Sequence, residues 1–367
     1  MTEPIRVMIV DDSSFMRRSL ERMLAADDIQ VVGIARDGID ALEKIPRIQP
    51  DILTLDVEMP RMDGLACLKR VMAEYPMPVL MVSSLTSEGA QATLDALALG
   101  ALDFIAKGKT SAFTDLSEIQ SELQEKIRKL ANSPKFRSFK HPKSPAPFAQ
   151  SPIPAIVQPP SPLVAPRAGA SQLPSSPKAD LILLGCSTGG PKALQDFLPH
   201  LPKNLPVPML IVQHMPSSFT KAFADRLNGI CQLEVKEASN GDTPKPGHVY
   251  IAPGGIHMNV RTQLGAYVID LNHEPANTLH RPSVDVLFQS ACDYCGAQMI
   301  AMILTGMGSD GAQGMKQLKS KGAYTISEAE SSCVVYGMPK SAFELGCVDV
   351  VAPIQDMAGI LKNHFQV

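Results

Sequence analysis

The chain has 367 residues, a formal net charge of −3 and seven cysteines. A length of this order predicts about two or three domains, and a hydrophobic content of 45% is enough for two cores. The near-balanced charge argues against a nucleic-acid partner, and the odd number of cysteines argues against a disulfide framework. The sequence begins without a signal-peptide pattern and has no apolar run of membrane-spanning length, so we expect a cytoplasmic protein without direct membrane insertion.

Predicted strands in the first third of the chain each end in a polar side chain. Residues 5–10 lead to Asp11 and Asp12, residues 50–55 to Asp56, residues 78–82 to Ser83, and residues 103–106 to Lys107. Carboxylates at one sheet edge repel each other, so this cluster is expected to hold a hard divalent cation such as Mg²⁺. Asp56 would then accept a phosphoryl group, whose oxygens Mg²⁺ and Lys107 neutralise and to which Ser83 donates a hydrogen bond. The alternative is an acidic loop cluster with an unrelated lysine.

A predicted amphipathic helix follows, and after it the composition changes. Residues 117–130 place four apolar side chains on one helical face, namely Ile119, Leu123, Ile127 and Leu130. The first domain is expected to close at about Asn132. Residues 133–178 are rich in Pro, Ser and Ala and contain no acidic residue, so they predict a disordered linker. A basic docking strip is the alternative function of this segment.

The most informative stretch is residues 181–191. Its apolar strand leads into the turn Gly185-Cys186-Ser187-Thr188-Gly189 and then into a predicted helix. A serine at such a turn is open to substrate, and the helix N-terminus offers N–H groups to a developing oxyanion. The spacing matches the G-x-S-x-G pattern of nucleophilic serines. The same geometry also suits a phosphate group, so both chemistries stay open at this point.

Two later strands end in residues that would complete a hydrolytic site. Residues 208–213 lead to His214, and residues 299–304 lead to a glycine-rich segment that contains Asp310. Ligands of open α/β sheets bind outside the carboxyl ends of the strands. Ser187, His214 and Asp310 are therefore expected to meet at one crevice, as nucleophile, general base and orienting carboxylate.

The sequence is less specific about the oxyanion donors and about the roles of the other histidines. Backbone N–H groups near Met307 or Thr188 would bind the oxyanion of a tetrahedral intermediate. The chain order of serine, histidine and aspartate differs from that of α/β-hydrolases, in which the acid precedes the histidine. His257 and His280 compete for the role of base, and we expect them to line the substrate groove instead.

Two classes of function follow from these motifs. The first is an ester hydrolase gated by phosphorylation, and the second is a phosphorylation-gated binding module whose glycine loop holds a phosphate or nucleotide. A P-loop places its lysine directly after the last glycine, whereas Gly190 is followed by Pro191, and Lys192 comes one residue late. The sequence therefore favours the hydrolase.

Both halves of the chain resemble known families. Residues 1 to about 130 are similar to response-regulator receiver domains, in Asp11-Asp12, in the run 53–64 around Asp56, in Val82-Ser83-Ser84 and in Lys107. Residues 179–367 resemble the catalytic domain of the CheB family of chemotaxis protein-glutamate methylesterases, in segments 185–190, 213–216, 280–288, 304–311 and 332–339. The resemblance covers the chain except for the linker.

This resemblance implies a fold for each half. Residues 1–132 would form a doubly wound, parallel-sheet receiver domain of the flavodoxin-like type. Residues 179–367 would form a three-layer α/β/α methylesterase domain with a largely parallel sheet, and residues 133–178 would join the two. One departure from the family is that Gly108, instead of the usual proline, follows Lys107, which leaves the geometry of that loop open.

The resemblance also implies the chemistry of the receiver. A chemotaxis histidine kinase would phosphorylate Asp56, with Mg²⁺ bound by Asp11, Asp12, Asp56 and the carbonyl oxygen of Glu58. Phe104 takes the position of the aromatic switch residue. In the unphosphorylated state the receiver would cover the catalytic site.

For the second half, the family's catalytic residues fall on Ser187, His214 and Asp310, with the backbone N–H of Met307 as oxyanion donor. The implied reactions are hydrolysis of glutamate methyl esters, which releases methanol, and deamidation of particular glutamines. The implied substrates are methyl-accepting chemoreceptors, and the implied esterase chemistry uses no cofactor.

Overall fold

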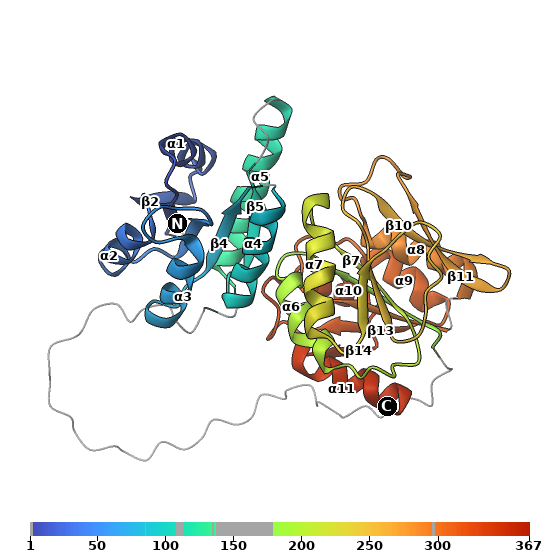
Figure 1. Ribbon diagram of the computed structural model, residues 1–367. Coiled ribbons are helices and arrows are strands. Elements are labelled where there is room, and N and C mark those ends of the chain that lie inside the picture. The colour runs from blue at the N-terminus through green and yellow to red at the C-terminus, as the bar shows by residue number, and fades with distance from the viewer. Residues whose placement is uncertain (1–2, 85, 108–112, 134–135, 137–178, 296–297) are drawn as a thin grey trace, which may run out of the picture.

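The computed structural model describes residues 3–84, 86–107, 113–133, 136, 179–295 and 298–367, which form two α/β units side by side (Figure 1). The predicted linker lies outside the described residues except at Ser133 and Phe136, and Gly108 also lies outside them. Within the described part of the chain, no helix combines the length and the apolar content that a membrane crossing requires.

The N-terminal unit is built on a five-stranded parallel sheet in the order β2-β1-β3-β4-β5. Alternate residues of β1 enter two different apolar clusters, because helices cover both faces of the sheet. The doubly wound receiver fold is thus confirmed. Its elements are β1 (Ile5–Val10), α1 (Ser14–Met23), β2 (Ile29–Ala35), α2 (Gly38–Ile48), β3 (Ile52–Asp56), α3 (Gly64–Glu74), β4 (Val79–Ser83), α4 (Ser87–Leu99), β5 (Asp103–Ala106) and α5 (Phe113–Ala131).

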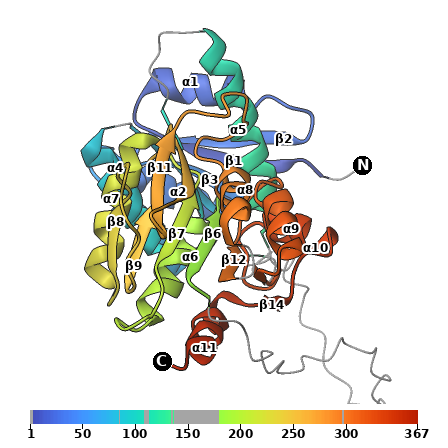
Figure 2. The ribbon, with the colours of Figure 1, turned by 90° about the vertical axis from the view of Figure 1, so that its right-hand side faces the viewer.

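The C-terminal unit is built on a seven-stranded sheet in the order β14-β13-β12-β6-β7-β9-β8, with parallel pairing throughout (Figure 2). Its strands are β6 (Leu181–Cys186), β7 (Met209–Gln213), β8 (Glu234–Glu237), β9 (His248–Ile251), β12 (Met299–Ile303), β13 (Tyr324–Glu328) and β14 (Val350–Ala352). β6 lies between β7 and β12, so the carboxyl ends of these three strands adjoin. The predicted α/β architecture is confirmed for this half as well.

Helices and one hairpin complete the C-terminal unit. The antiparallel hairpin pairs β10 (His257–Gln263) with β11 (Ala266–Asn272). The helices are α6 (Gly190–Phe197), a 3₁₀ turn at Leu198–His200, α7 (Ser217–Ile230), α8 (Val284–Cys295), α9 (Ala312–Ser320), α10 (Met338–Glu344) and α11 (Ile354–Phe365). Alternate residues of β6 enter clusters on opposite sides of the sheet, which gives the expected three layers.

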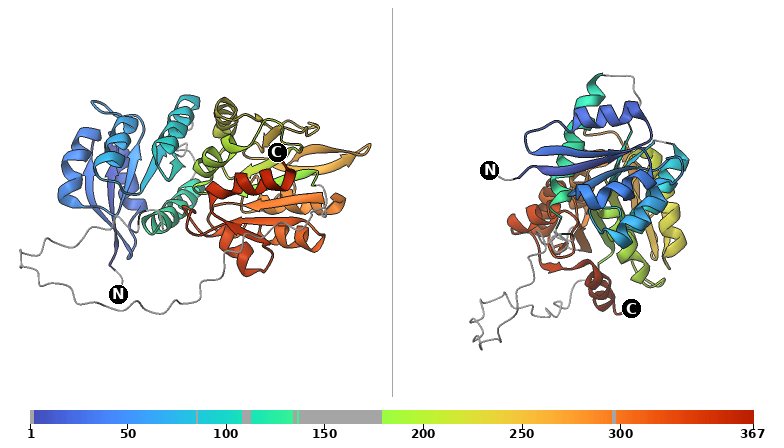
Figure 3. Two further views of the ribbon diagram at one scale, coloured as in Figure 1. Left: turned by 90° about the horizontal axis from the view of Figure 1, so that it is seen from below. Right: turned by 90° about the vertical axis from the view of Figure 1, so that its left-hand side faces the viewer.

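The predicted helix 117–130 is part of α5, which packs one apolar face inward. Leu123, Ile127 and Leu130 have no exposed surface. They share a buried cluster with Val334 and Val335 of the C-terminal unit. Figure 3 shows α5 at the boundary between the two units.

The two units also meet through α4, which packs against α6 and α7. The ring of Phe104 in β5 stacks on Phe219 in α7, with ring centroids 4.6 Å apart. Asp95 in α4 forms an ion pair with Arg226 in α7. The receiver therefore contacts the helix that begins three residues after His214.

Candidate functional site

Ser187 lies at the carboxyl end of β6, whose residues are all buried. The backbone N–H of Ser187 donates to the carbonyl oxygen of Thr305, 3.0 Å away, and this bond ties the serine to the end of β12. Gly189 has a φ of 80°, and a Cβ there would lie 2.5 Å from Cβ of Val334. The turn that presents the serine therefore requires glycine at this position.

His214 follows β7, next to the end of β6. Its backbone N–H donates to the carbonyl oxygen of Cys186 (3.2 Å). The ring Nε2 is 2.8 Å from Oδ2 of Asp310, and both side chains are largely buried. Donation from Nε2 to the carboxylate leaves Nδ1 with a free lone pair, and Nδ1 is buried without a hydrogen-bond partner among the described residues. Nδ1 is thus the ring nitrogen available to act as a base.

Asp310 is held by the first turn of α8. Its two oxygens accept hydrogen bonds from the backbone N–H groups of Val284 (2.7 Å) and Asp285 (2.9 Å) and from Oγ of Ser283 (2.8 Å). Burial raises the pKa of this carboxyl group. The hydrogen bond and charge of His214, together with these backbone donors, outweigh burial and hold the pKa of Asp310 well below its ordinary value.

His280 and His257, the other two candidate bases, lie in different surroundings. The ring of His280 stacks on that of His214, with centroids 4.1 Å apart, and burial together with His214 lowers the pKa of His280 to about 4. His257 is completely buried, its Nδ1 accepts from the backbone N–H of Ser283, and its Nε2 pairs with Thr278. The prediction that His257 lines a groove is therefore wrong, because the buried side chain bonds to the segment before α8.

The predicted oxyanion groups lie beside the serine. Gly306 approaches so closely that a Cβ there would lie 2.9 Å from Cβ of Ser187. The backbone of Gly306 is fixed by its N–H bond to Val335, and Met307 follows directly. Among the described residues, no acceptor is bonded to the backbone N–H of Met307 or of Thr188. Both groups are thus free to donate to a ligand.

The receiver site brings its predicted carboxylates together. Ligand atoms of Asp11, Asp12 and Asp56 all lie within 4.8 Å of one another. Nζ of Lys107 is 2.8 Å from Oδ2 of Asp56 and 3.2 Å from Oδ2 of Asp11. Burial raises the pKa of Asp56 to about 6, although Lys107 opposes this effect. The three clustered carboxylates supply the hard oxygen ligands that fit a divalent cation.

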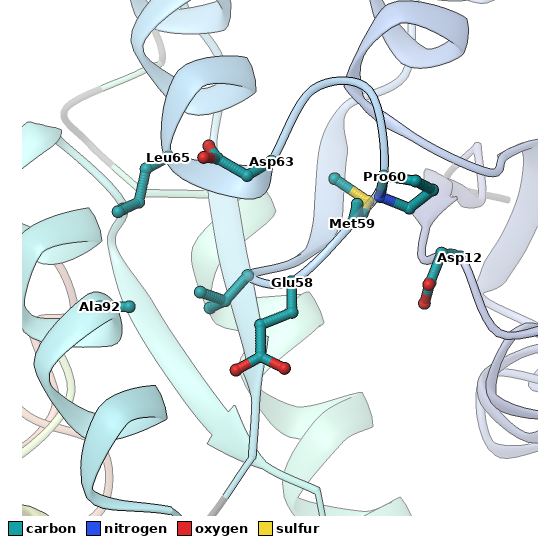
Figure 4. Close-up of a pocket in the computed structure, with 8 residues that line it drawn as sticks. Asp12, Glu58, Met59, Pro60, Asp63, Leu65 and Ala92 are labelled. Atoms are coloured by element: carbon teal, nitrogen blue, oxygen red, sulfur yellow. The ribbon is translucent and has the colours of Figure 1, made fainter.

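Among the described residues, the side chains of Ser83 and Glu58 form no hydrogen bond with Asp56. Oγ of Ser83 is buried and bonds to the carbonyl oxygen of Gly89 (3.2 Å) and to Oγ1 of Thr93 (2.5 Å), so it faces α4. Glu58 and Asp12 come from separate segments that line one pocket beside the cluster (Figure 4). A bond from Ser83 to a phosphoryl group therefore needs a rotation of its side chain.

Sequence reasoning gave no role to Gln213 and Ser283, which contact the site directly. Gln213 ends the apolar run of β7 and is only 2% exposed, and its side chain bonds to the backbone of both Ser187 and His214. The signal in the sequence was a polar residue inside the buried part of a strand, directly before the candidate base.

Comparison with known proteins finds two family models on separate parts of the chain. The CheB methylesterase family model matches residues 182–361, and the response regulator receiver domain model matches residues 7–117. A curated relative from Oleidesulfovibrio alaskensis, named protein-glutamate methylesterase/protein-glutamine glutaminase 1, is 46% identical over 98% of this chain and 99% of its own length. A relative from Nitratidesulfovibrio vulgaris, with the same name and the number 2, is 46% identical with the same coverage.

Among solved structures, the catalytic domain of the Thermotoga maritima CheB methylesterase is 42% identical, with a TM-score of 0.49, and covers 50% of this chain and 97% of that chain. The family models and the curated relatives together define a hydrolase joined to a receiver domain. The chain belongs to the CheB methylesterase family. It is an enzyme that hydrolyses carboxylic esters, so the alternative of a binding module is wrong.

Proposed function

We propose that Ser187, His214 and Asp310 are the catalytic triad with which this enzyme demethylates glutamate methyl esters and deamidates glutamines of methyl-accepting chemoreceptors. The observation that carries the assignment is the 2.8 Å pair of His214 and Asp310 at the strand end next to Ser187. Asp310 fixes the ring proton on Nε2, so Nδ1 accepts the proton of the Ser187 hydroxyl group. A glycine loop that only held a phosphate group would have no use for such a pair.

The reaction then proceeds through an acyl-enzyme. Oγ of Ser187 attacks the ester carbonyl carbon, and the backbone N–H groups of Met307 and Thr188 bind the resulting oxyanion. His214 returns the proton to the departing methoxide, which leaves as methanol. Water hydrolyses the acyl-enzyme by the same proton transfers, and an amide substrate releases ammonia instead of methanol.

Methanol release from methylated receptor membranes tests this assignment. Ser187→Ala should lower the turnover by about 10⁴–10⁶-fold, because triad residues act as a unit. Ser320→Ala, on the exposed end of α9, is the matched control and should leave the rate unchanged. Retention of more than a tenth of the wild-type rate by purified, folded Ser187→Ala would show that the nucleophile lies elsewhere.

We also propose that a chemotaxis histidine kinase phosphorylates Asp56. Asp11, Asp12, Asp56 and the carbonyl oxygen of Glu58 would hold Mg²⁺, which when bound neutralises charge on the phosphoryl group. Lys107 already lies against Asp56 and would neutralise a second phosphoryl oxygen. Ser83 would turn from α4 to donate to a third, with Phe104 as the side chain that responds.

The receiver assignment predicts a loss of labelling with retained basal activity. Asp56→Asn should abolish labelling by a small phosphodonor together with the accompanying rise in esterase rate, and a chelator should have the same effect on wild-type protein. Basal methanol release should persist in both cases, because Ser187 lies in the other unit. Labelling of Asp56→Asn at the wild-type stoichiometry would place the acceptor on another residue.

The division of the chain is proposed on the same grounds, with a receiver over residues 1–132, a linker over residues 133–178 and a methylesterase domain over residues 179–367. Chemoreceptor adaptation sites and the phosphodonor kinase face the cell interior in this interpretation, which places the enzyme in the cytoplasm.

A further inference from the structure

The carboxamide of Gln213 joins the two strands that carry the proposed nucleophile and base. Nε2 donates to the carbonyl oxygen of Ser187 (3.0 Å) and to the carbonyl oxygen of His214 (3.0 Å). Oε1 accepts from the thiol of Cys186 (3.1 Å). The side chain is 2% exposed. The carbonyl oxygen of Ser187 also accepts from the backbone N–H of Gly190 (2.8 Å), so loss of the amide donors removes a second bond from Ser187 and the bond that the carbonyl oxygen of His214 accepts.

The position of these bonds matters because the strands separate there. Cys186 and Gln213 are the last paired residues of β6 and β7. Beyond them the backbone N–H of His214 still donates to Cys186, while the chain after Ser187 turns into α6 and the chain after His214 runs on to α7. The two N–H groups of the Gln213 amide thus bridge the main chain where the sheet ladder has ended.

The space for this carboxamide is created by Gly190. A Cβ on Gly190 would lie 2.0 Å from Oε1 of Gln213 and 3.0 Å from the side chain of Cys186. The first residue of α6 therefore packs directly on the amide and holds its plane in place. This close approach is independent of the hydrogen bonds and indicates a fixed, built contact.

We propose that Gln213 is a positioning residue that sets the separation of Ser187 and His214 during attack on the ester. It touches neither substrate nor reacting atom, and the proposal rests on the triad assigned above. A misplacement of about 1 Å between reacting groups lowers a rate by about 10²-fold. Loss of the two hydrogen bonds from Gln213, which together we call the bridge, should therefore lower kcat and leave KM unchanged.

Gln213→Met tests the bridge directly, because methionine keeps the volume and removes both donors. Full-length protein is assayed by methanol release over a range of methylated receptor membrane concentrations. We expect kcat to fall by about 10- to 100-fold with KM within twofold of wild type. Thr325→Val on β13 is the matched control, since it removes a buried hydroxyl group that donates to Asp349 and bonds no triad residue. It should lower the melting temperature and leave kcat unchanged.

Gln213→Glu gives a second readout that a purely structural role would not produce. A protonated glutamic acid keeps one donor for the two carbonyl oxygens, and an ionised one keeps none. The ratio of variant to wild-type kcat should therefore fall as the pH rises. The same ratio for Thr325→Val should stay flat with pH.

Each outcome decides the proposal. A folded Gln213→Met variant with kcat within twofold of wild type overturns it, as does a Gln213→Glu ratio that does not change with pH. Failure of both variants to fold makes the residue structural and overturns it too. A wrong triad assignment would be recognised separately, because Ser187→Ala would then remain active. If only the proposal for Gln213 is wrong, Ser187→Ala is inactive and Gln213→Met is active.

Discussion

The ring of Phe104 stacks on the ring of Phe219, at a centroid distance of 4.6 Å and an interplanar angle of 25°. Phe104 belongs to β5 of the receiver, three residues before Lys107, and Phe219 belongs to the first turn of α7. Both side chains are buried. The aromatic position proposed to respond to phosphorylation therefore lies in the surface that joins the receiver to the catalytic unit.

Loss of this stack should raise the basal rate. Aromatic pairs contribute about 0.5–1.5 kcal/mol beyond their burial, so Phe104→Ala should shift the balance toward the uncovered state by about 2- to 10-fold. Basal methanol release without phosphodonor should rise by a similar factor. Phe365→Ala removes an aromatic pair with His364 on α11 and serves as control. An unchanged or lower basal rate for a folded Phe104→Ala protein would contradict a covering role for the receiver.

The isolated C-terminal unit should release methanol faster than the unphosphorylated full-length protein. A fragment of residues 179–367 keeps the seven-stranded sheet and all three triad residues and loses the receiver. We expect it to fold, to release methanol faster than unphosphorylated full-length protein on the same membranes, and not to respond to phosphodonor. A stable fragment that is no faster would exclude inhibition by covering and leave activation by the phosphorylated receiver.

The buried carboxyl group of Asp56 should make receiver stability depend on pH. Its folded-state pKa of about 6 lies above the ordinary 3.8, so ionisation of Asp56 costs folding free energy. The cost is absent below pH 3.8 and complete above pH 6. In the presence of a chelator, Asp56→Asn should raise the melting temperature at pH 8 by a few degrees, equivalent to about 1–2 kcal/mol, and should have little effect near pH 4.

Thermal unfolding at the two pH values checks this expectation. Asp225→Asn, an exposed carboxylate on α7, provides the control and should show no such difference. An equal shift at pH 4 and pH 8 would attribute the effect to something other than ionisation of Asp56.

Ser283 should contribute to activity through Asp310. Its Oγ donates one of the bonds that hold the carboxylate, and a neutral or charge-assisted bond of this kind contributes about 1–2 kcal/mol. Ser283→Ala should therefore lower kcat about 5- to 30-fold, with less effect on KM. Ser290→Ala removes a hydroxyl group from the same helix that bonds Leu287 and Val260 instead. An equal fall in kcat for Ser283→Ala and Ser290→Ala would indicate that loss of any such hydroxyl group around α8 lowers the rate, and not the bond to Asp310 in particular.

The strand ends could be predicted because each is a local pattern. An apolar run followed by a polar residue marks where a buried parallel strand leaves the sheet. Ser187 and His214 directly follow such strands, and Asp310 lies in the glycine-rich segment after a third. The same logic brought Asp11, Asp56 and Lys107 together, and the structure places them within ion-pair distance.

Contacts between distant side chains could not be predicted in this way. The bonds of Gln213 depend on the register of β6 against β7, and the stack of Phe104 on Phe219 depends on how the two units pack. His257 was misplaced for a similar reason, since its polar ring gave no sign that Ser283 and Thr278 would satisfy it inside the protein. Which ring nitrogen of His214 faces Asp310 also follows only from the fold.

α7 begins shortly after His214 and carries both Phe219 and Arg226, which contact the receiver. One continuous helix thus runs from the boundary between the units to the neighbourhood of His214, the proposed general base. A shift of this helix would reach both units without involving residues 133–178, the proposed linker. We therefore expect variants with a shorter linker to keep their response to phosphodonor.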